Sequence, residues 1–121
     1  MSTPRKTLSL SKVVAPADGP TLSSEAQIIA QAVRRKLCIT AVYNRTSMTI
    51  APHILYTKHD DPFIDGVVML RDGKVPAEPK LGTFKLAGLN GVMLTADNFT
   101  VTSLYDPADA KYEGVTLAKV D

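Results

Sequence analysis

The chain of 121 residues has no tryptophan and a single cysteine, Cys38, and its longest uninterrupted apolar run is the four residues 67–70. A helix that crosses a bilayer needs roughly 20 apolar residues, so we expect no membrane contact. One cysteine cannot form an intramolecular disulfide, which indicates a reducing compartment and a cytoplasmic protein. Paired cysteines, a glycine-rich phosphate loop and a hydrolase nucleophile elbow are also missing, so we expect a protein that is not an enzyme and holds no cofactor.

Acidic residues are missing from a long stretch of the chain. The formal net charge is only +2, but residues 26–58 contain five cations and no acid, whereas residues 97–121 contain five acids and two cations. A basic half of this kind could contact the acidic end, a second copy or a phosphate group. Charge alone leaves these three partners open.

Composition and segment boundaries indicate one folded domain with short flanking pieces. Apolar residues at 45% and charged residues at 21% are close to globular averages. Residues 1–22 contain three prolines, few large apolar groups and an excess of cations, which is typical of a disordered basic arm without a targeting function. We expect the main domain over residues 23–105 and a C-terminal turn and edge segment over residues 106–121.

The first element of the main domain is predicted to be an amphipathic helix. Ser24 and Gln27 have the spacing of a capping box, apolar residues then recur at helical spacing, and the helix should end near Lys36.

The stretch 38–56 predicts two strands joined by a polar turn at residues 44–47. In the second strand, alternation should place Met48, Ile50, Pro52, Ile54 and Tyr56 on one face and Thr49, Ala51, His53 and Thr57 on the other. Further strands are predicted at residues 63–70, 81–87 and 92–95, with a tight reversal at residues 88–91 and an edge strand at residues 115–120.

One helix followed by about five short sequential strands predicts a mainly β fold. We expect a small barrel or a strongly bent antiparallel sheet, capped by the helix, because a flat open sheet would expose edges to neighbouring chains.

The order of these features resembles the WYL-domain family of bacterial regulators over roughly residues 26–99. The similarity is carried by the helix 28–36, the strand ending at Tyr43, the segment Pro52-His53-Ile54-Leu55 and the segment Phe84-Lys85-Leu86-Ala87-Gly88-Leu89. The resemblance implies a five-stranded SH3 or Sm-like barrel and a ligand-sensing role in transcription, with nucleic acid as a frequent ligand. Two positions depart from the family pattern: Pro62-Phe63-Ile64 stands where the family has Trp-Tyr-Leu, and Gly88 stands where it has an arginine.

A face that binds nucleic acid needs cations for phosphates and aromatic rings for bases. Seven candidates meet this description: Tyr43, Arg45, His53, Tyr56, Lys58, Phe63 and Lys85. We expect the partner to be single-stranded DNA or RNA, or a small anionic ligand, and we predict one anion-binding patch formed by Arg45, His53, Lys58 and Lys85. In the alternative interpretation, the aromatic residues belong to the core or its rim and the cations are ordinary solvated surface.

Two other classes of function remain open. His59, Asp60 and Asp61, with His53 and Asp65 nearby in sequence, offer nitrogen and carboxylate groups for a metal, although their spacing matches no known ligand motif. Exposed strand edges and the charge asymmetry would also suit a structural or assembly module that binds a protein partner or forms a homo-oligomer.

Overall fold

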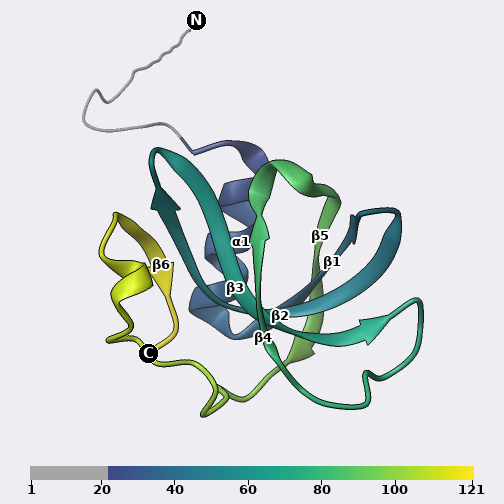
Figure 1. Ribbon diagram of the computed structural model, residues 1–121. Helices are drawn as coiled ribbons and strands as arrows, with labels where there is room; N and C mark the ends of the chain where they lie inside the picture. Colours follow the sequence, from purple (N-terminus) through teal and green to yellow (C-terminus); the bar gives the residue numbers. More distant parts are fainter. Residues whose placement is uncertain (1–21) are drawn as a thin grey trace, which may run out of the picture.

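The structure is a computed structural model that describes residues 22–121, so all but the last residue of the basic arm expected for residues 1–22 lies outside the described residues. One helix and a six-stranded antiparallel sheet form the described part of the chain (Figure 1). The mainly β fold with an N-terminal helix is therefore confirmed. The elements are α1 (Ser24–Arg35), β1 (Leu37–Tyr43), β2 (Thr46–Lys58), β3 (Asp61–Arg71), β4 (Leu81–Lys85), η1 (Leu86–Gly88), β5 (Leu89–Asn98), η2 (Ala110–Tyr112) and β6 (Thr116–Lys119).

Helix α1 begins one residue earlier than the predicted capping box requires. Ser23 is the N-cap, and its hydroxyl accepts a hydrogen bond from the backbone N–H of Ala26 at 3.2 Å. The Gln27 side chain donates to the carbonyl of Leu22 and does not close a capping box. Lys36 ends the helix in the left-handed conformation, as expected for a C-cap.

The sheet has the strand order β4-β3-β2-β1-β5, and β6 pairs with β2 beyond the end of β1. The long β2 pairs with β3 along one side, and shares its other side between β1 and β6. The expected barrel is wrong: within residues 22–121 no ladder joins β4 to β5, and the sheet is neither closed nor strongly curled.

An aromatic contact next to η1 connects β1 to β4 through side chains. The rings of Tyr43 and Phe84 meet edge to face, with centroids 5.2 Å apart. Gly88, where the WYL family has an arginine, leaves space for the ring of Tyr43, because a Cβ at this position would lie 2.9 Å from Cε1 of Tyr43. The two rings thus join β1 and β4 next to η1 through a side-chain contact.

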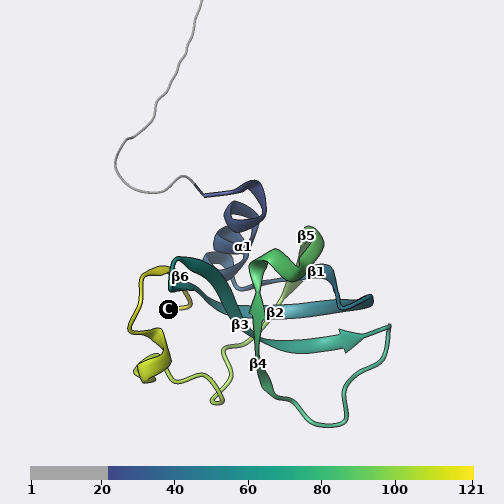
Figure 2. The same cartoon turned by 45° about the horizontal axis from the view of Figure 1, so that its top comes forward.

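Cross-strand register sorts the side chains into two faces. One row of paired residues faces the core and consists of Leu94, Ile39, Ile50 and Val68. The neighbouring row lies on the opposite face, which we call the outer face, and consists of Met93, Thr40, Thr49 and Leu70. Helix α1 contacts β1, β2, β5 and β6 and lies against one side of the sheet (Figure 2).

The C-terminal segment 99–121 returns along the sheet and is not separate from the main domain. Tyr105 and Tyr112 are buried in the same hydrophobic core as the strands, and β6 adds the last strand near the predicted residues 115–120. Among residues 22–121, no helix is both long enough and apolar enough to cross a membrane.

Candidate functional site

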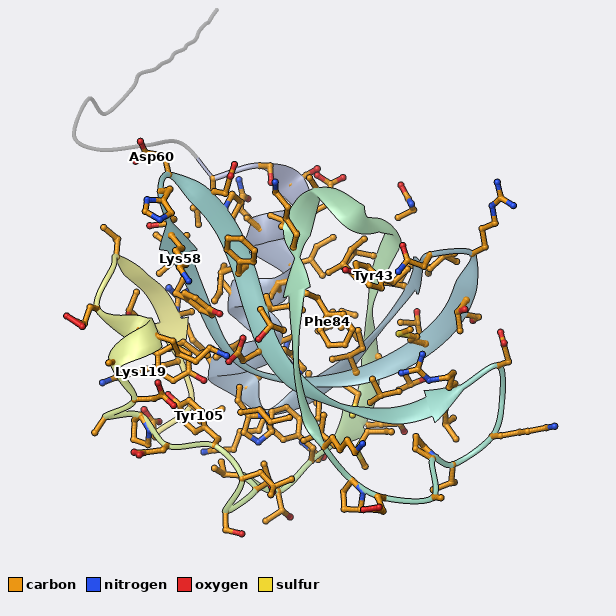
Figure 3. All side chains as sticks on the ribbon, in the orientation of Figure 1. Tyr43, Lys58, Asp60, Phe84, Tyr105 and Lys119 are labelled. Atoms are coloured by element: carbon orange, nitrogen blue, oxygen red, sulfur yellow. The ribbon has the colours of Figure 1, made fainter. Side chains whose placement is uncertain are left out.

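The seven candidate residues do not form one patch. Arg45 lies in the turn between β1 and β2, and Lys58 ends β2, so the two cations are separated by a strand about 40 Å long at roughly 3.3 Å per residue. Figure 3 shows Lys58 and Asp60 at the β2–β3 turn, on the side of the molecule opposite to the β1–β2 turn. Arg45 and Lys58 therefore cannot bind the same phosphate.

His53 is a buried structural residue. It is the extra residue of a β-bulge between the pairs Pro52–Gly66 and Ile54–Asp65, and only 1% of it is exposed. Its Nε2 accepts the backbone N–H of Thr102 at 3.1 Å, so its proton lies on Nδ1, which donates to the carbonyl of Ala51 at 2.9 Å. A neutral, buried ring with both nitrogens engaged is unavailable to an anion.

The other candidates are engaged within the protein in different ways. Tyr56 is buried and its ring stacks on that of Phe63, with centroids 6.0 Å apart. Lys85 is exposed and forms an ion pair with Asp61 at 3.6 Å. Tyr43 packs on Phe84 and is half-buried. Only Arg45 and Lys58 are both exposed and without an ion-pair partner in the part of the chain that the structure describes.

The proposed metal ligands do not converge. His59 and Asp60 occupy left-handed positions in the β2–β3 turn, whereas His53 and Asp65 are buried within strands. Residues 22–121 contain no group of three histidine, cysteine or acidic side chains that could hold a metal ion.

A buried carboxylate on β3 organises a network that connects the sheet to the C-terminal segment. Asp65 has no exposed surface, and its Oδ1 accepts the Tyr56 hydroxyl at 2.8 Å. Its Oδ2 accepts the Tyr112 hydroxyl at 2.6 Å and pairs with Lys111 Nζ at 2.8 Å. Lys111 also donates to Thr83 Oγ1 on β4 at 2.9 Å. We call these five residues the Asp65 network.

The Asp65 network stabilises an ionised carboxylate and neutral phenols. Burial alone would raise the pKa of Asp65, but hydrogen bonds from Lys111, Tyr112 and Tyr56 outweigh it and lower the pKa below 3.8. Burial and the adjacent carboxylate raise the pKa values of Tyr56 and Tyr112. Both carboxylate oxygens are thus occupied by donors, so Asp65 has the properties of a structural anchor.

A second feature is an open groove of about 540 Å³ between the end of β3, the loop that follows it and β4. Val68, Leu81 and Phe84 contribute apolar surface, and Arg71, Lys80 and Glu78 contribute charge. Arg71 and Lys80 are exposed, and neither has an ion-pair partner among residues 22–121. The groove therefore combines free cations with an apolar floor.

The groove lies at the more basic end of the sheet. Asp72 accepts the backbone N–H of Ser47 at 3.2 Å, which joins the turn after β3 to the β1–β2 hairpin. This end, which we call the basic end, carries four exposed cations against the two acids Asp72 and Glu78; the cations are Arg45, Arg71, Lys74 and Lys80. The opposite end, at the β2–β3 turn, is balanced, with Lys58 and Lys85 against Asp60 and Asp61.

The comparisons with known proteins leave the family open. No family model, no curated protein and no solved structure matches this chain. The resemblance to the WYL-domain family therefore stays a prediction from the sequence.

Stability is expected to decrease in mild acid because His53 is buried in its neutral form. Burial lowers its pKa below 6.5, so the unfolded chain binds a proton at a higher pH than the folded chain. The contribution of His53 to stability is then complete above pH 6.5 and is lost as the pH falls below that value. Urea unfolding of wild type and His53→Gln across this range should show a steeper loss in the wild type. Parallel pH curves for the two proteins would contradict the assignment.

Proposed function

We propose that this chain is a non-enzymatic binding module that holds an anionic ligand in the groove, with single-stranded nucleic acid as the leading class. The observation that carries the proposal is the pairing of two free cations, Arg71 and Lys80, with the apolar surface of Val68, Leu81 and Phe84 in one open groove. Cations at the rim suit phosphates, and an apolar floor suits the body of a base or another flat group.

The surroundings of the groove favour a polymer over an isolated anion. The groove is open to solvent, and the basic end continues beyond it through Lys74 to Arg45. A chain of phosphates can contact several such cations in succession, whereas a small ligand would contact only Arg71 and Lys80. The carboxylate of Glu78 at the rim of the groove repels negatively charged groups, so it should limit how deeply a phosphate enters the groove.

A role as a regulator is supported by the sequence resemblance to the WYL-domain family, whose members sense ligands in transcription. The open sheet and the glycine at position 88 set this chain apart from the family pattern, and the groove residues Arg71 and Lys80 lie outside the motif segments. We therefore propose ligand binding through the groove as the function, with control of transcription as its biological setting.

Removing both groove cations should weaken binding of a single-stranded oligonucleotide. The variant Arg71→Ala/Lys80→Ala is expected to lose affinity about tenfold at low salt, because two exposed charge contacts are worth about 1.4 kcal/mol together. The slope of log affinity against log salt should fall by about 1.4, at 0.7 for each phosphate no longer neutralised on a single strand. Fluorescence anisotropy of labelled DNA and RNA oligonucleotides over a salt series measures both quantities.

The matched control removes the same charge elsewhere. Lys58 and Lys119 are exposed and lie away from the groove, on the side of the molecule that carries Tyr105 (Figure 3). Lys58→Ala/Lys119→Ala should keep the wild-type affinity and salt slope. If both double variants weaken binding equally, the groove is not the site. If the wild type binds neither DNA nor RNA at low salt, the proposed function is wrong.

A further inference from the structure

Strand β5 has the least protected edge of the sheet. Three strands have a side that no strand pairs within residues 22–121: β4, β5 and β6. Strands β4 and β6 have five and four residues, and each ends in a lysine, Lys85 and Lys119. Strand β5 has ten residues, contains no proline and has no charge before Asp97. Short strands and lysines are two common means of preventing pairing between sheet edges, and β5 has neither; its protection is limited to two register shifts against β1.

The outer face next to this edge exposes large apolar side chains. Met93 on β5 is 65% exposed, and Val42 on β1 is 40% exposed. Met93 pairs with Thr40, so Met93, Thr40 and Val42 lie on the same face of the two strands. The exposed Leu70 on β3 extends the row of Met93 across the sheet. The edge and the adjoining face therefore offer both backbone hydrogen-bonding groups and apolar contact.

We infer that β5 pairs antiparallel with β5 of a second copy of this chain, which makes one sheet continuous across a twofold axis. Two identical strands can pair antiparallel about a twofold axis. Each contact between two residues of the two copies is then repeated with the copies exchanged. The charges at the two ends of β5 favour the same arrangement. Asp97 lies near the end of β5. Arg45 lies in the β1–β2 turn, two residues after Tyr43, which pairs with Leu89 at the start of β5. In an antiparallel pair, Asp97 of one copy approaches the end that carries Arg45 of the other.

This interface leaves the groove free in both copies. The groove is lined by residues of β3, β4 and the loop between them, and none belongs to β5. A dimer would thus present two grooves, and one polymer that reaches both would bind more tightly than it binds a single copy. The interface does not depend on the proposed ligand, since it forms between copies of the chain alone.

The oligomeric state of the full chain without ligand tests this inference. Sedimentation equilibrium over a range of concentrations should show a dimer in exchange with a monomer. Met93→Lys places like charges near each other in the two copies and should raise the dimer dissociation constant about tenfold or more. Val115→Lys is the matched control, because Val115 is 60% exposed and lies outside β5, and it should dimerise as the wild type does.

Three results would overturn the β5 interface. They are a monomer at every concentration, equal weakening by Met93→Lys and Val115→Lys, or an assembly that Met93→Lys leaves unchanged. Far-UV circular dichroism of each variant checks that it is folded, and hydrogen exchange gives a second measure in the wild type. The amides of β5 should become more protected as the concentration rises, and unchanged protection would also count against the interface.

Discussion

Replacing Asp65 with alanine is expected to lower the free energy of unfolding by about 3 to 5 kcal/mol, the usual loss when one partner of a buried charge network is removed. The carboxylate is fully buried and accepts both tyrosine hydroxyls and the ammonium group of Lys111. Without it, the hydroxyls of Tyr56 and Tyr112 stay buried without an acceptor, and each unpaired group destabilises by about 1 to 3 kcal/mol. Urea unfolding followed by far-UV circular dichroism measures the change.

Asp61→Ala provides the control for this variant. Asp61 pairs with Lys85 at 3.6 Å, but about half of each side chain is exposed, so the pair should contribute less than about 1 kcal/mol. A loss at Asp65 as small as the loss at Asp61 would show that the Asp65 network does not hold the C-terminal segment on the sheet. The single variants Tyr56→Phe and Tyr112→Phe should each show an intermediate loss.

Gly66→Ala should destabilise the sheet by about 1 to 3 kcal/mol, the range expected for overpacking a filled core. A Cβ at position 66 would lie 2.6 Å from the carbonyl oxygen of Ala51 and 2.9 Å from Cγ2 of Ile50. The carbonyl belongs to the backbone of β2 and cannot move without disturbing the ladder. Gly66 pairs with Pro52, directly before the bulge at His53, so β2 and β3 approach closely where the register changes.

The cross-strand partner of Gly66 supplies a matched control. Gly82 on β4 pairs with Gly66, but a Cβ at position 82 would meet the ring of Phe84 at 3.3 Å and the carbonyl oxygen of Gly66 at 3.8 Å, an ordinary van der Waals distance. A side chain can shift by a few tenths of an ångström, so Gly82→Ala should destabilise by less than about 1 kcal/mol. Equal effects of the two variants on the urea midpoint would contradict the close approach of β2 and β3 at Gly66.

Local sequence patterns predicted the elements well because each depends on neighbouring residues. The helix, the β1–β2 hairpin and the final edge strand were expected close to their observed positions. The predicted faces of β2 are correct only as far as Pro52. Beyond it, the bulge at His53 adds a residue and reverses which side chains lie on which face. No pattern within β2 indicates that bulge, since it depends on the pairing of β2 with β3.

The predicted binding patch failed for a related reason. Arg45, His53, Lys58 and Lys85 are close to the motif-like segments in sequence, but β2 holds Arg45 and Lys58 at its opposite ends. The Asp65 network was missed because it joins residues as far apart as Asp65 and Tyr112, which are 47 positions apart. Its one local signal was a carboxylate within the apolar run of β3. The groove likewise combines a strand end, a loop and an edge strand that no short motif contains.

Mapping the binding surface by two-dimensional NMR tests the central claim most directly. A ¹H–¹⁵N spectrum of the full chain, titrated with an unlabelled single-stranded oligonucleotide at low salt, reports on each backbone amide. The proposal predicts that the largest shifts occur at Arg71, Lys80 and Phe84, with smaller shifts at Arg45 and little change at Lys58. Shifts centred on the β2–β3 turn, or no shift at saturating oligonucleotide, would contradict binding in the groove.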